Sequence, residues 1–279
     1  MESPVKPYLR HCLFAAALPA AAQAETYVVG VEKADFEPYF SVDAKGEYRG
    51  FARDLLDAFA RDAGIELRYQ PVEPGRLLGE LLAGRVDLKY PDSPTWAKDA
   101  KAGKDVRYSA ATVDFIDGVL VAPLQQGKGI QHLKRLAVVG GWTPEQYREP
   151  IASGHLAQVN AGDLRDLIRT TLKKQADGAY YNVEVAIHHL NYRSSSTNAL
   201  VFDSMLPYSR GTYHLSTVKQ PQLIARFDRF LQEHPLEVAT LKSRYRVEEN
   251  INSEFVGMEQ WKVDFIQRQR AKAQQTAQQ

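Results

Sequence analysis

The chain has 279 residues, with 35 lysine and arginine against 34 aspartate and glutamate residues, so its formal net charge at pH 7 is +1. It contains no basic block and no strong charge excess, which argues against a nucleic-acid partner. Its single cysteine, Cys12, stands near the N-terminus, so the rest of the chain forms no disulfide.

Residues 1–24 have the pattern of a secretory signal peptide. A short basic start is followed by the apolar run "LFAAALPAAA", which is too short to span a bilayer. Small residues end this run and predict cleavage before Glu25. Cys12 precedes the apolar run, which argues against a lipid anchor. We therefore expect an exported, periplasmic protein whose mature chain has 279 minus 24, or 255, residues and a formal charge of 0.

From Glu25 onward, strand-like and helix-like segments alternate. Apolar residues on one stripe predict a helix over residues 50–64, with Gly64 as its stop. The other segments predicted in this half are strands at 26–31, 65–72 and 86–90 and a helix from 74 to about 84. A βαβαβ order predicts a mainly parallel sheet covered by helices.

A second set of segments follows. Residues 142–151 predict a helix that Thr143 caps, with Pro144 at its first position and Gln146 completing a capping box. A helix over residues 162–175 is predicted to place Leu164, Leu167, Ile168 and Leu172 on one face. The remaining predicted segments are strands at 136–141 and 177–183, helices at 183–190, 222–234 and 235–246, and an extended return at 212–219. Beyond residue 255 we expect a helix that frays into a disordered tail after about Arg270.

Three segments in this order resemble one known family. They are "FEPYFSVDAKGEYRGFARDLLDAFARDAGIEL", "LLAGRVDLKY" and "DVRYSAATVDFIDGVLVAP". The chain resembles the periplasmic solute-binding proteins of the polar amino-acid uptake type, the family 3 receptors of ABC transporters, over about residues 26–246.

The resemblance implies an α/β, two-lobed periplasmic binding protein type II fold, in which each lobe is a mainly parallel sheet flanked by helices. Two hinge strands, "GVLVAP" and "YSRGTYH", would join the lobes. The implied divisions are a signal peptide at 1–24, lobe 1 at 25–118 plus 208–250, lobe 2 at 123–207, and a C-terminal helix and polar tail at 251–279. The ligand would lie between the lobes, at strand ends and near helix N-termini.

The family holds an α-amino acid by its two charges, with an arginine for the carboxylate and an aspartate for the amino group. In this sequence Trp96 stands where the arginine is expected, in a loop about three residues shorter than usual, and Asn182 stands where the aspartate is expected. A standard zwitterionic amino acid is therefore not the expected ligand. The resemblance implies that Phe36 covers the ligand, although core packing is an equal alternative.

Aromatic residues and one carboxylate are the expected lining, which suits a cation with an apolar body or a flat ring. The expected ligand-binding residues are Phe36, Tyr39, Tyr90, Asp92, Ser93, Trp96, Trp142, Thr143 and Asn182. Lys89 is interpreted as an edge-strand residue with a solvated head; pairing with Asp92 or with an acidic ligand is the alternative.

The sequence therefore predicts a monomeric periplasmic receptor that closes around a small ligand for an ABC-type transporter or a sensor, with no cofactor and no metal. His188 and His189 are adjacent and point about 100° apart on a helix, so they cannot chelate one metal. One alternative is a dehydratase-like enzyme on the same scaffold, for which Glu37 and Glu184 are the nearby acids. The other is a vestigial receptor that acts by protein contact.

Overall fold

The computed structural model describes residues 24–140, 142, 144–193, 199–249, 251, 256 and 263–270. The predicted signal peptide, apart from Ala24, and the predicted tail after Arg270 lie outside these residues. Within the described part of the chain, no helix has both the length and the apolar character needed to cross a bilayer.

Ten strands form one long sheet with the order β10-β9-β11-β8-β13-β6-β1-β5, with β12 beside β8 and β7 beside β13. Their bounds are β1 Thr26–Glu32, β5 Glu66–Val72, β6 Leu88–Asp92, β7 Arg107–Tyr108, β8 Val113–Val121, β9 Arg135–Val139, β10 Ala157–Ala161, β11 Gly178–Asn182, β12 Val201–Phe202 and β13 Ser209–Thr217. A second, small sheet consists of β2 Asp35–Phe36, β3 Phe40–Val42 and β4 Tyr48–Arg49.

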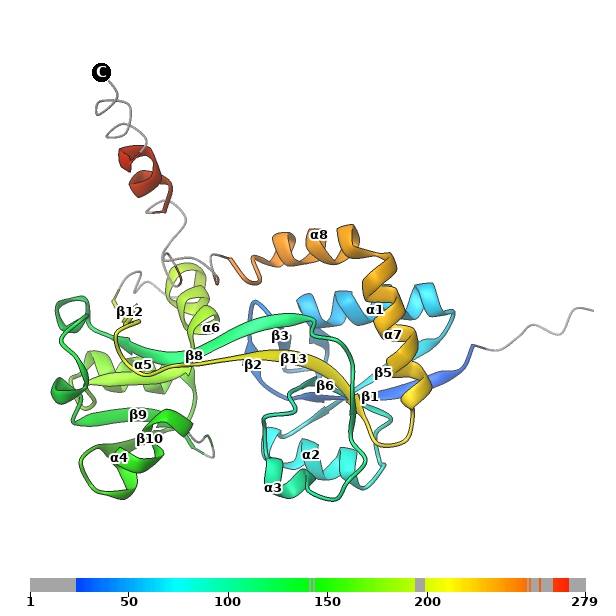
Figure 1. Ribbon diagram of the computed structural model, residues 1–279, viewed down its shortest axis with the longest axis horizontal. Helices are drawn as coiled ribbons and strands as arrows, with labels where there is room; N and C mark the ends of the chain where they lie inside the picture. Colours follow the sequence, from blue (N-terminus) through cyan, green and yellow to red (C-terminus); the bar gives the residue numbers. More distant parts are fainter. Residues whose placement is uncertain are drawn as a thin grey trace, which may run out of the picture.

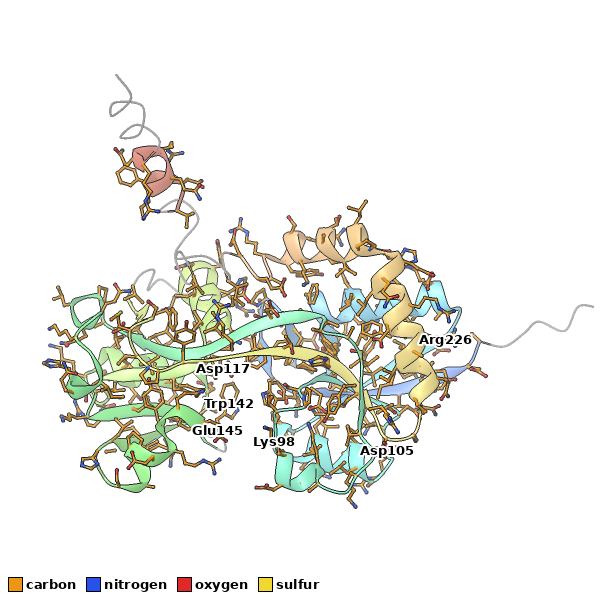
Figure 2. All side chains as sticks on the ribbon, in the orientation of Figure 1. Lys98, Asp105, Asp117, Trp142, Glu145 and Arg226 are labelled. Carbon is orange, nitrogen blue, oxygen red and sulfur yellow. The ribbon has the colours of Figure 1, made fainter. Side chains whose placement is uncertain are left out.

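The sheet has a parallel part at each end and an antiparallel middle. We call the part with β5, β1 and β6 lobe 1, and the part with β10, β9 and β11 lobe 2; within each, neighbouring strands are parallel, as predicted. The long strands β8 and β13 run antiparallel to each other and connect the two lobes (Figure 1). Figure 2 shows Asp117 of β8 at this connection. The predicted extended return and the second predicted hinge both fall largely within the single strand β13.

Helices cover both faces of the sheet, with α1, α7 and α8 above lobe 1 and α2 below it in Figure 1. The helices are α1 Phe51–Ala63, α2 Pro74–Leu82, α3 Lys98–Lys101, α4 Arg148–Ala152, α5 Leu164–Leu172, α6 Val183–His188, α7 Pro221–Glu233 and α8 Pro235–Tyr245. A five-residue π-helix, His189–Arg193, extends α6, and short 3₁₀ turns lie at Pro123–Gln125, Ile130–His132 and Glu145–Tyr147. Residues 263–270 are also helical.

The helix α1 confirms the clearest of the sequence predictions. Its stripe Phe51, Leu55 and Phe59 is fully buried, and Gly64 ends it in the left-handed conformation at φ 64°. Gly50, which precedes it, has φ 104°, and a β-carbon there would lie 2.9 Å from the Cα of Phe40. Only glycine therefore lets the β2–β4 hairpins pack directly against the start of α1.

The prediction of a helix from residue 142 is wrong in its start. Residues 145–147 form a 3₁₀ turn and α4 begins only at Arg148, because Pro150 is tolerated in the first turn of a helix but not in its interior. The proposed cap, Thr143, lies outside the described residues. In α5, Leu172 is 41% exposed although its stripe is otherwise buried, because it is the last residue of the helix.

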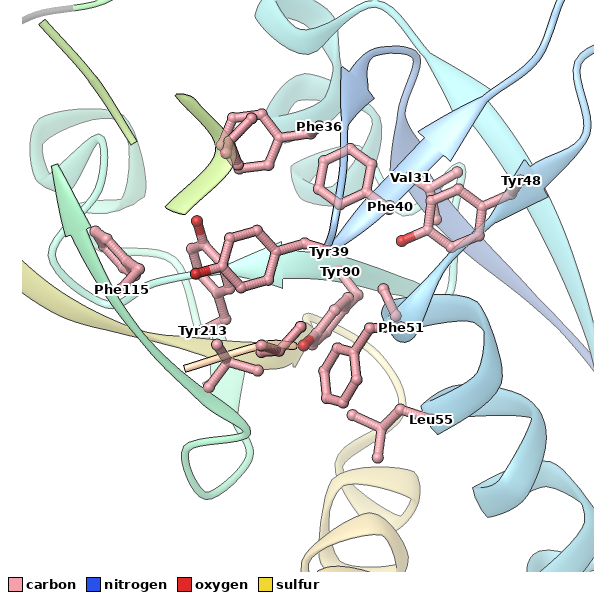
Figure 3. Packing of buried hydrophobic residues seen from close by; sticks show 14 of the residues in the cluster. Val31, Phe36, Tyr39, Phe40, Tyr48, Phe51, Leu55, Tyr90, Phe115 and Tyr213 are labelled. Atoms are coloured by element: carbon pink, nitrogen blue, oxygen red, sulfur yellow. The ribbon is translucent and has the colours of Figure 1, made fainter. Parts of the chain in front are cut away.

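The core of lobe 1 is rich in aromatic residues (Figure 3). Tyr48 is 2% exposed, and among the described residues its hydroxyl is the buried side-chain polar atom without a hydrogen-bond partner. An unmade buried hydrogen bond costs about 1–3 kcal/mol.

We expect Tyr48→Phe to stabilise the protein by about 1 kcal/mol, because the variant removes a hydroxyl that makes no hydrogen bond but keeps the ring. Urea denaturation of both proteins measures the difference in the free energy of unfolding. Tyr90→Phe is the matched control, because the hydroxyl of Tyr90 lies 2.8 Å from that of Thr112, and this variant is expected to be destabilised. A destabilised Tyr48→Phe would contradict the prediction.

Candidate functional site

A cavity of about 800 Å³ lies between the two lobes. Lobe 1 contributes the end of β1 and the residues that follow it, together with the start of α2; lobe 2 contributes the end of β9, the turn before α5, and α6 with its π-helix extension. The carboxyl ends of parallel strands and the beginnings of helices thus meet at this cavity, as in other α/β folds that bind ligands.

The apolar side of the cavity is formed by three aromatic rings, which we call the aromatic shelf: Phe36, Trp142 and Tyr181. The rings of Trp142 and Tyr181 in lobe 2 are stacked at 4.7 Å and 13°. Phe36 of lobe 1 packs against both, at 6.1 and 5.8 Å between ring centroids. Figure 2 shows Trp142 on the side of lobe 2 that faces lobe 1. Two of the residues expected at the site, Phe36 and Trp142, therefore line the cavity.

Trp96 does not line this cavity. Its ring packs against Phe115 of β8 and Tyr213 of β13, each at 5.7 Å, in an aromatic cluster that also holds Tyr39 at 5.3 Å from Tyr213. Figure 3 shows Tyr39, Phe115 and Tyr213 converging where the lobes meet. The indole that the resemblance placed at the arginine position thus packs against the connecting strands.

Asp92, the carboxylate that the sequence analysis expected at the site, lies in the core and not on the wall of this cavity. It is 1% exposed, and its oxygens lie 3.1 Å from Lys89 Nζ and 2.8 Å from Lys101 Nζ, while Ser216 Oγ donates to it at 2.7 Å. Burial disfavours its charge, but the two lysines and Ser216 outweigh burial and hold the pKa of Asp92 below its usual value. Ser93, 1% exposed, accepts from Lys101 Nζ through its carbonyl oxygen at 2.8 Å. This ion cluster belongs to the core.

The interpretation of Lys89 as a solvated edge residue is wrong. Its strand, β6, lies between β13 and β1, so neither side of the strand faces solvent, and Lys89 is 4% exposed. The alternative pairing with Asp92 is the one observed. Lys89 Nζ also donates to the carbonyl oxygen of Pro91 at 2.7 Å and lies 5.6 Å from the centre of the Trp96 ring. A lysine of the chain itself therefore occupies the place between carboxylate and aromatic ring that the sequence analysis gave to a cationic ligand.

Asn182 is fully buried and does not line the cavity either. Its side-chain oxygen accepts from Val185 N at 3.1 Å and so caps α6. Its amide nitrogen donates to Asp117 at 3.3 Å and to the Tyr213 hydroxyl at 3.4 Å. Burial raises the pKa of Asp117 to about 7, against the effect of this amide. Asn182 thus connects lobe 2 to both connecting strands.

The other expected residues lie in the core or outside the described chain. Tyr90 is 2% exposed in the core. Tyr39 donates from its hydroxyl to Glu184 of α6 in lobe 2. Burial raises the pKa of Glu184 to about 7, against the effect of that hydroxyl. Thr143 lies outside the described residues.

The charged wall of the cavity was largely missed from sequence. It carries five acids, Glu32, Asp35, Glu37, Glu73 and Asp163, and its basic groups are Lys33, Arg165, Arg193, His188 and His189. Most acids and one of the basic residues come from lobe 1, and both arginines and both histidines come from lobe 2. The end of the predicted first strand was the signal for Glu32, because strand ends face ligands in this kind of sheet. No sequence pattern indicated that Arg193 would line the cavity.

Among the described residues, Glu32 is the acid of this wall whose side chain makes no hydrogen bond and no direct ion pair. The others are partnered: Asp35 and Glu37 with Arg193, Glu73 with Lys33 at 3.3 Å, and Asp163 with the backbone of α5. Glu32 is half-buried, and burial raises its pKa above the usual value while the charge of Lys89 opposes this. Within the described chain, no group of histidine and carboxylate side chains has the arrangement of a metal site.

The chain is similar to known proteins in its sequence profile and in its fold. The profile of the bacterial extracellular solute-binding proteins, family 3, matches residues 27–245, and no curated protein matches the chain. An ancestral arginine-binding protein bound to arginine is similar at a TM-score of 0.63 and 16% identity, over 79% of this chain and 97% of that one. A histidine kinase sensor domain with similarity to periplasmic binding proteins gives 0.63 and 16%, over 80% and 96%.

An ancestral amino acid-binding protein that is a precursor of cyclohexadienyl dehydratase gives a TM-score of 0.60 at 19% identity, over 79% of this chain and 95% of that one. These likenesses show the two-lobed type II periplasmic binding protein fold. Because the matched profile spans most of the chain, residues 27–245 of 279, the protein belongs to the bacterial extracellular solute-binding proteins, family 3.

Proposed function

We propose that this protein is a periplasmic receptor for a small organic cation with an apolar body, which is not a standard α-amino acid. It closes around the ligand and presents it to a membrane partner, an ABC-type transporter or a sensor. Lobe 1, residues 25–118 and 208–250, and lobe 2, residues 123–207, move about the two connecting strands. Export through the N-terminal signal peptide is part of the same proposal.

The observation that supports this ligand class is the unpaired carboxylate of Glu32 on the same cavity as the aromatic shelf. A half-buried carboxylate without a partner gains a charge-assisted contact when a cation binds. The faces of Phe36, Trp142 and Tyr181 favour an apolar body or a cationic group placed over a ring.

The two arginines of the wall already lie beside acids of the chain, so they argue against a ligand with a free α-carboxylate. Arg193 pairs with Glu37 and Asp35, and Arg165 lies 3.9 Å from Asp35. A ligand carboxylate would compete with these acids for the same guanidinium groups. Trp96 and Asn182, at the positions of the family's charged residues, are engaged in packing and helix capping.

The alternatives have weaker support. For a dehydratase-like enzyme, Glu37 does lie beside an arginine, but that arginine pairs with Glu37 itself and is not free to anchor an anionic substrate. For a vestigial receptor, a filled cleft is expected, whereas the cavity here measures about 800 Å³.

We expect Glu32→Gln to weaken the binding of an organic cation about tenfold or more, because it removes the charge of the unpaired carboxylate and keeps its shape. Native mass spectrometry of the gently purified periplasmic protein first seeks the copurified ligand. Calorimetry then compares benzyltrimethylammonium and phenethylamine with L-arginine and L-glutamine as probes.

Glu73→Gln is the matched control, because Glu73 lines the same cavity but pairs with Lys33 and is 61% exposed. It is expected to change the affinity less than about threefold. A tighter affinity for L-arginine or L-glutamine than for benzyltrimethylammonium and phenethylamine, or equal affinities in wild type and Glu32→Gln, would refute the proposed ligand class.

A further inference from the structure

One side of the cavity is closed by acidic and basic side chains that belong to different lobes. We call this group the interlobe latch: Asp35 and Glu37 from β2 and the turn after it, and Arg165, His188 and Arg193 from α5, α6 and the π-helix. The central contact joins Arg193 to Glu37, and Arg193 Nη1 also lies 3.5 Å from Asp35 Oδ1. Around it, His188 Nε2 lies 3.8 Å from Glu37 Oε2, and Arg165 Nη2 lies 3.9 Å from Asp35 Oδ2.

The latch also separates two hollows of the molecule. Asp35, Glu37, His188 and Arg193 line both the ligand cavity and a second groove of about 660 Å³. That groove is also lined by residues of β3, β4 and the end of α8, where Arg246 lies over the ring of Tyr192. The four shared residues are therefore the common wall of both hollows, and this wall is complete only when the lobes are together.

The arrangement is suited to hold the lobes together. The acids stand on lobe 1 and the bases on lobe 2, so every contact of the latch crosses the cleft and is lost when the lobes separate. The side chains of Arg193 and Glu37 are 35% and 34% exposed, which lies between a solvated surface pair and a buried one. Isolated exposed pairs contribute little, but a network that shares its members contributes more.

The π-helix explains how Arg193 reaches this position. The segment His189–Arg193 continues α6 with a wider turn, and such π-helical turns are frequent at functional sites. A regular α-helical continuation would rotate Arg193 relative to the acids of the hairpin. The local geometry of the main chain is therefore part of the latch.

We propose that the interlobe latch, centred on Arg193, stabilises the closed arrangement of the lobes independently of ligand and so sets how readily the cleft opens. Ligand contacts then add to closure that the chain's own charges already favour. The proposal concerns the lobes alone and holds whichever ligand class the cavity binds.

The test measures the distance between the lobes without any ligand. The mature chain has no cysteine, so Lys98→Cys on α3 and Glu145→Cys before α4 give two exposed labelling positions, one on each lobe (Figure 2). Spin labels at both positions report the distance distribution by electron–electron double resonance. Arg193→Ala and the double variant Asp35→Asn with Glu37→Gln are compared with the labelled parent.

We expect the ratio of short to long distances to fall about fivefold in Arg193→Ala and at least as much in the double variant. One-molar salt is expected to shift the parent in the same direction, because it screens exposed charges. Arg169→Ala is the matched control, since this arginine pairs within α5 with Asp166 at 2.6 Å, and its distribution is expected to equal the parent's. The proposal is overturned if neither latch variant gains long distances, or if Arg169→Ala gains as many.

Discussion

Replacing Asp92 by asparagine is expected to lower the free energy of unfolding by about 3 kcal/mol or more. The amide keeps the shape of the side chain but leaves two buried lysines, Lys89 and Lys101, without their shared negative charge. Breaking a buried ion pair from one side is among the most damaging single changes, because the remaining charge has lost both water and partner. Urea unfolding followed by circular dichroism measures this loss.

A matched surface variant and a double variant make this test specific. Glu237→Gln removes one acid of an exposed pair with Arg61 and is expected to cost less than about 1 kcal/mol. In the Asp92→Asn background, Lys101→Met is expected to recover part of the loss, because it removes one of the two uncompensated charges. If Asp92→Asn is as stable as wild type and instead loses ligand, then Asp92 faces the cleft after all.

Low pH is expected to reduce the stability that the ion cluster of Asp92, Lys89 and Lys101 contributes. The pKa of Asp92 is lower in the folded protein than its ordinary value near 3.9, so its contribution to stability is complete above about pH 4. It is lost as the pH falls below that value, through the lowered pKa.

Glu184→Gln is expected to become more stable relative to wild type as the pH rises, by about 2 kcal/mol between pH 5 and pH 8. Glu184 has a pKa of about 7 in the folded protein because of burial, against an ordinary value near 4.3. Its contribution to wild-type stability is therefore complete below about pH 4 and is lost as the pH rises towards 7, because ionisation is easier in the unfolded chain. The glutamine cannot ionise and keeps a hydrogen-bond acceptor for the Tyr39 hydroxyl.

The measurement compares denaturation midpoints of the two proteins at several pH values. A difference between two proteins is needed because His188 and His189, whose pKa values are lowered by burial, titrate in the opposite sense and lose stability below about pH 6.5. Asp117→Asn provides an independent second variant, since burial also raises the pKa of Asp117 to about 7. A difference that stays constant from pH 5 to pH 8 would contradict the assignment.

The sequence was sufficient for the periodic elements and for the family. The stripe of α1, the glycine that ends it and the parallel order of the strands follow from local pattern, because burial on one face repeats with the period of the element. The profile match over residues 27–245 confirms the family that three segments had indicated. Pro150 explains the one clear error of helix placement, and that signal was present in the sequence.

The candidate site was predicted only in part, because its members are far apart in the sequence. Phe36 and Trp142 line the cavity as expected, but Tyr39, Tyr90, Asp92, Ser93, Trp96 and Asn182 do not. A match to a family motif predicts which loop approaches the cleft. It does not predict whether a given side chain of that loop points into the cleft or into the core. For Asp92 the deciding partners, Lys101 and Ser216, come from other elements.

Sequence alone thus determined the class of fold and the family, because amphipathic period, turn residues and motif order are local properties that survive large changes in side chains. The tertiary structure alone decided which charges are free. Lys89 neutralises Asp92 inside the core, Arg193 pairs with Glu37 across the cleft, and Glu32 is left without a direct partner beside the aromatic shelf. Electrostatic pairing depends on distances of a few ångströms between distant parts of the chain, and only the assembled lobes set those distances.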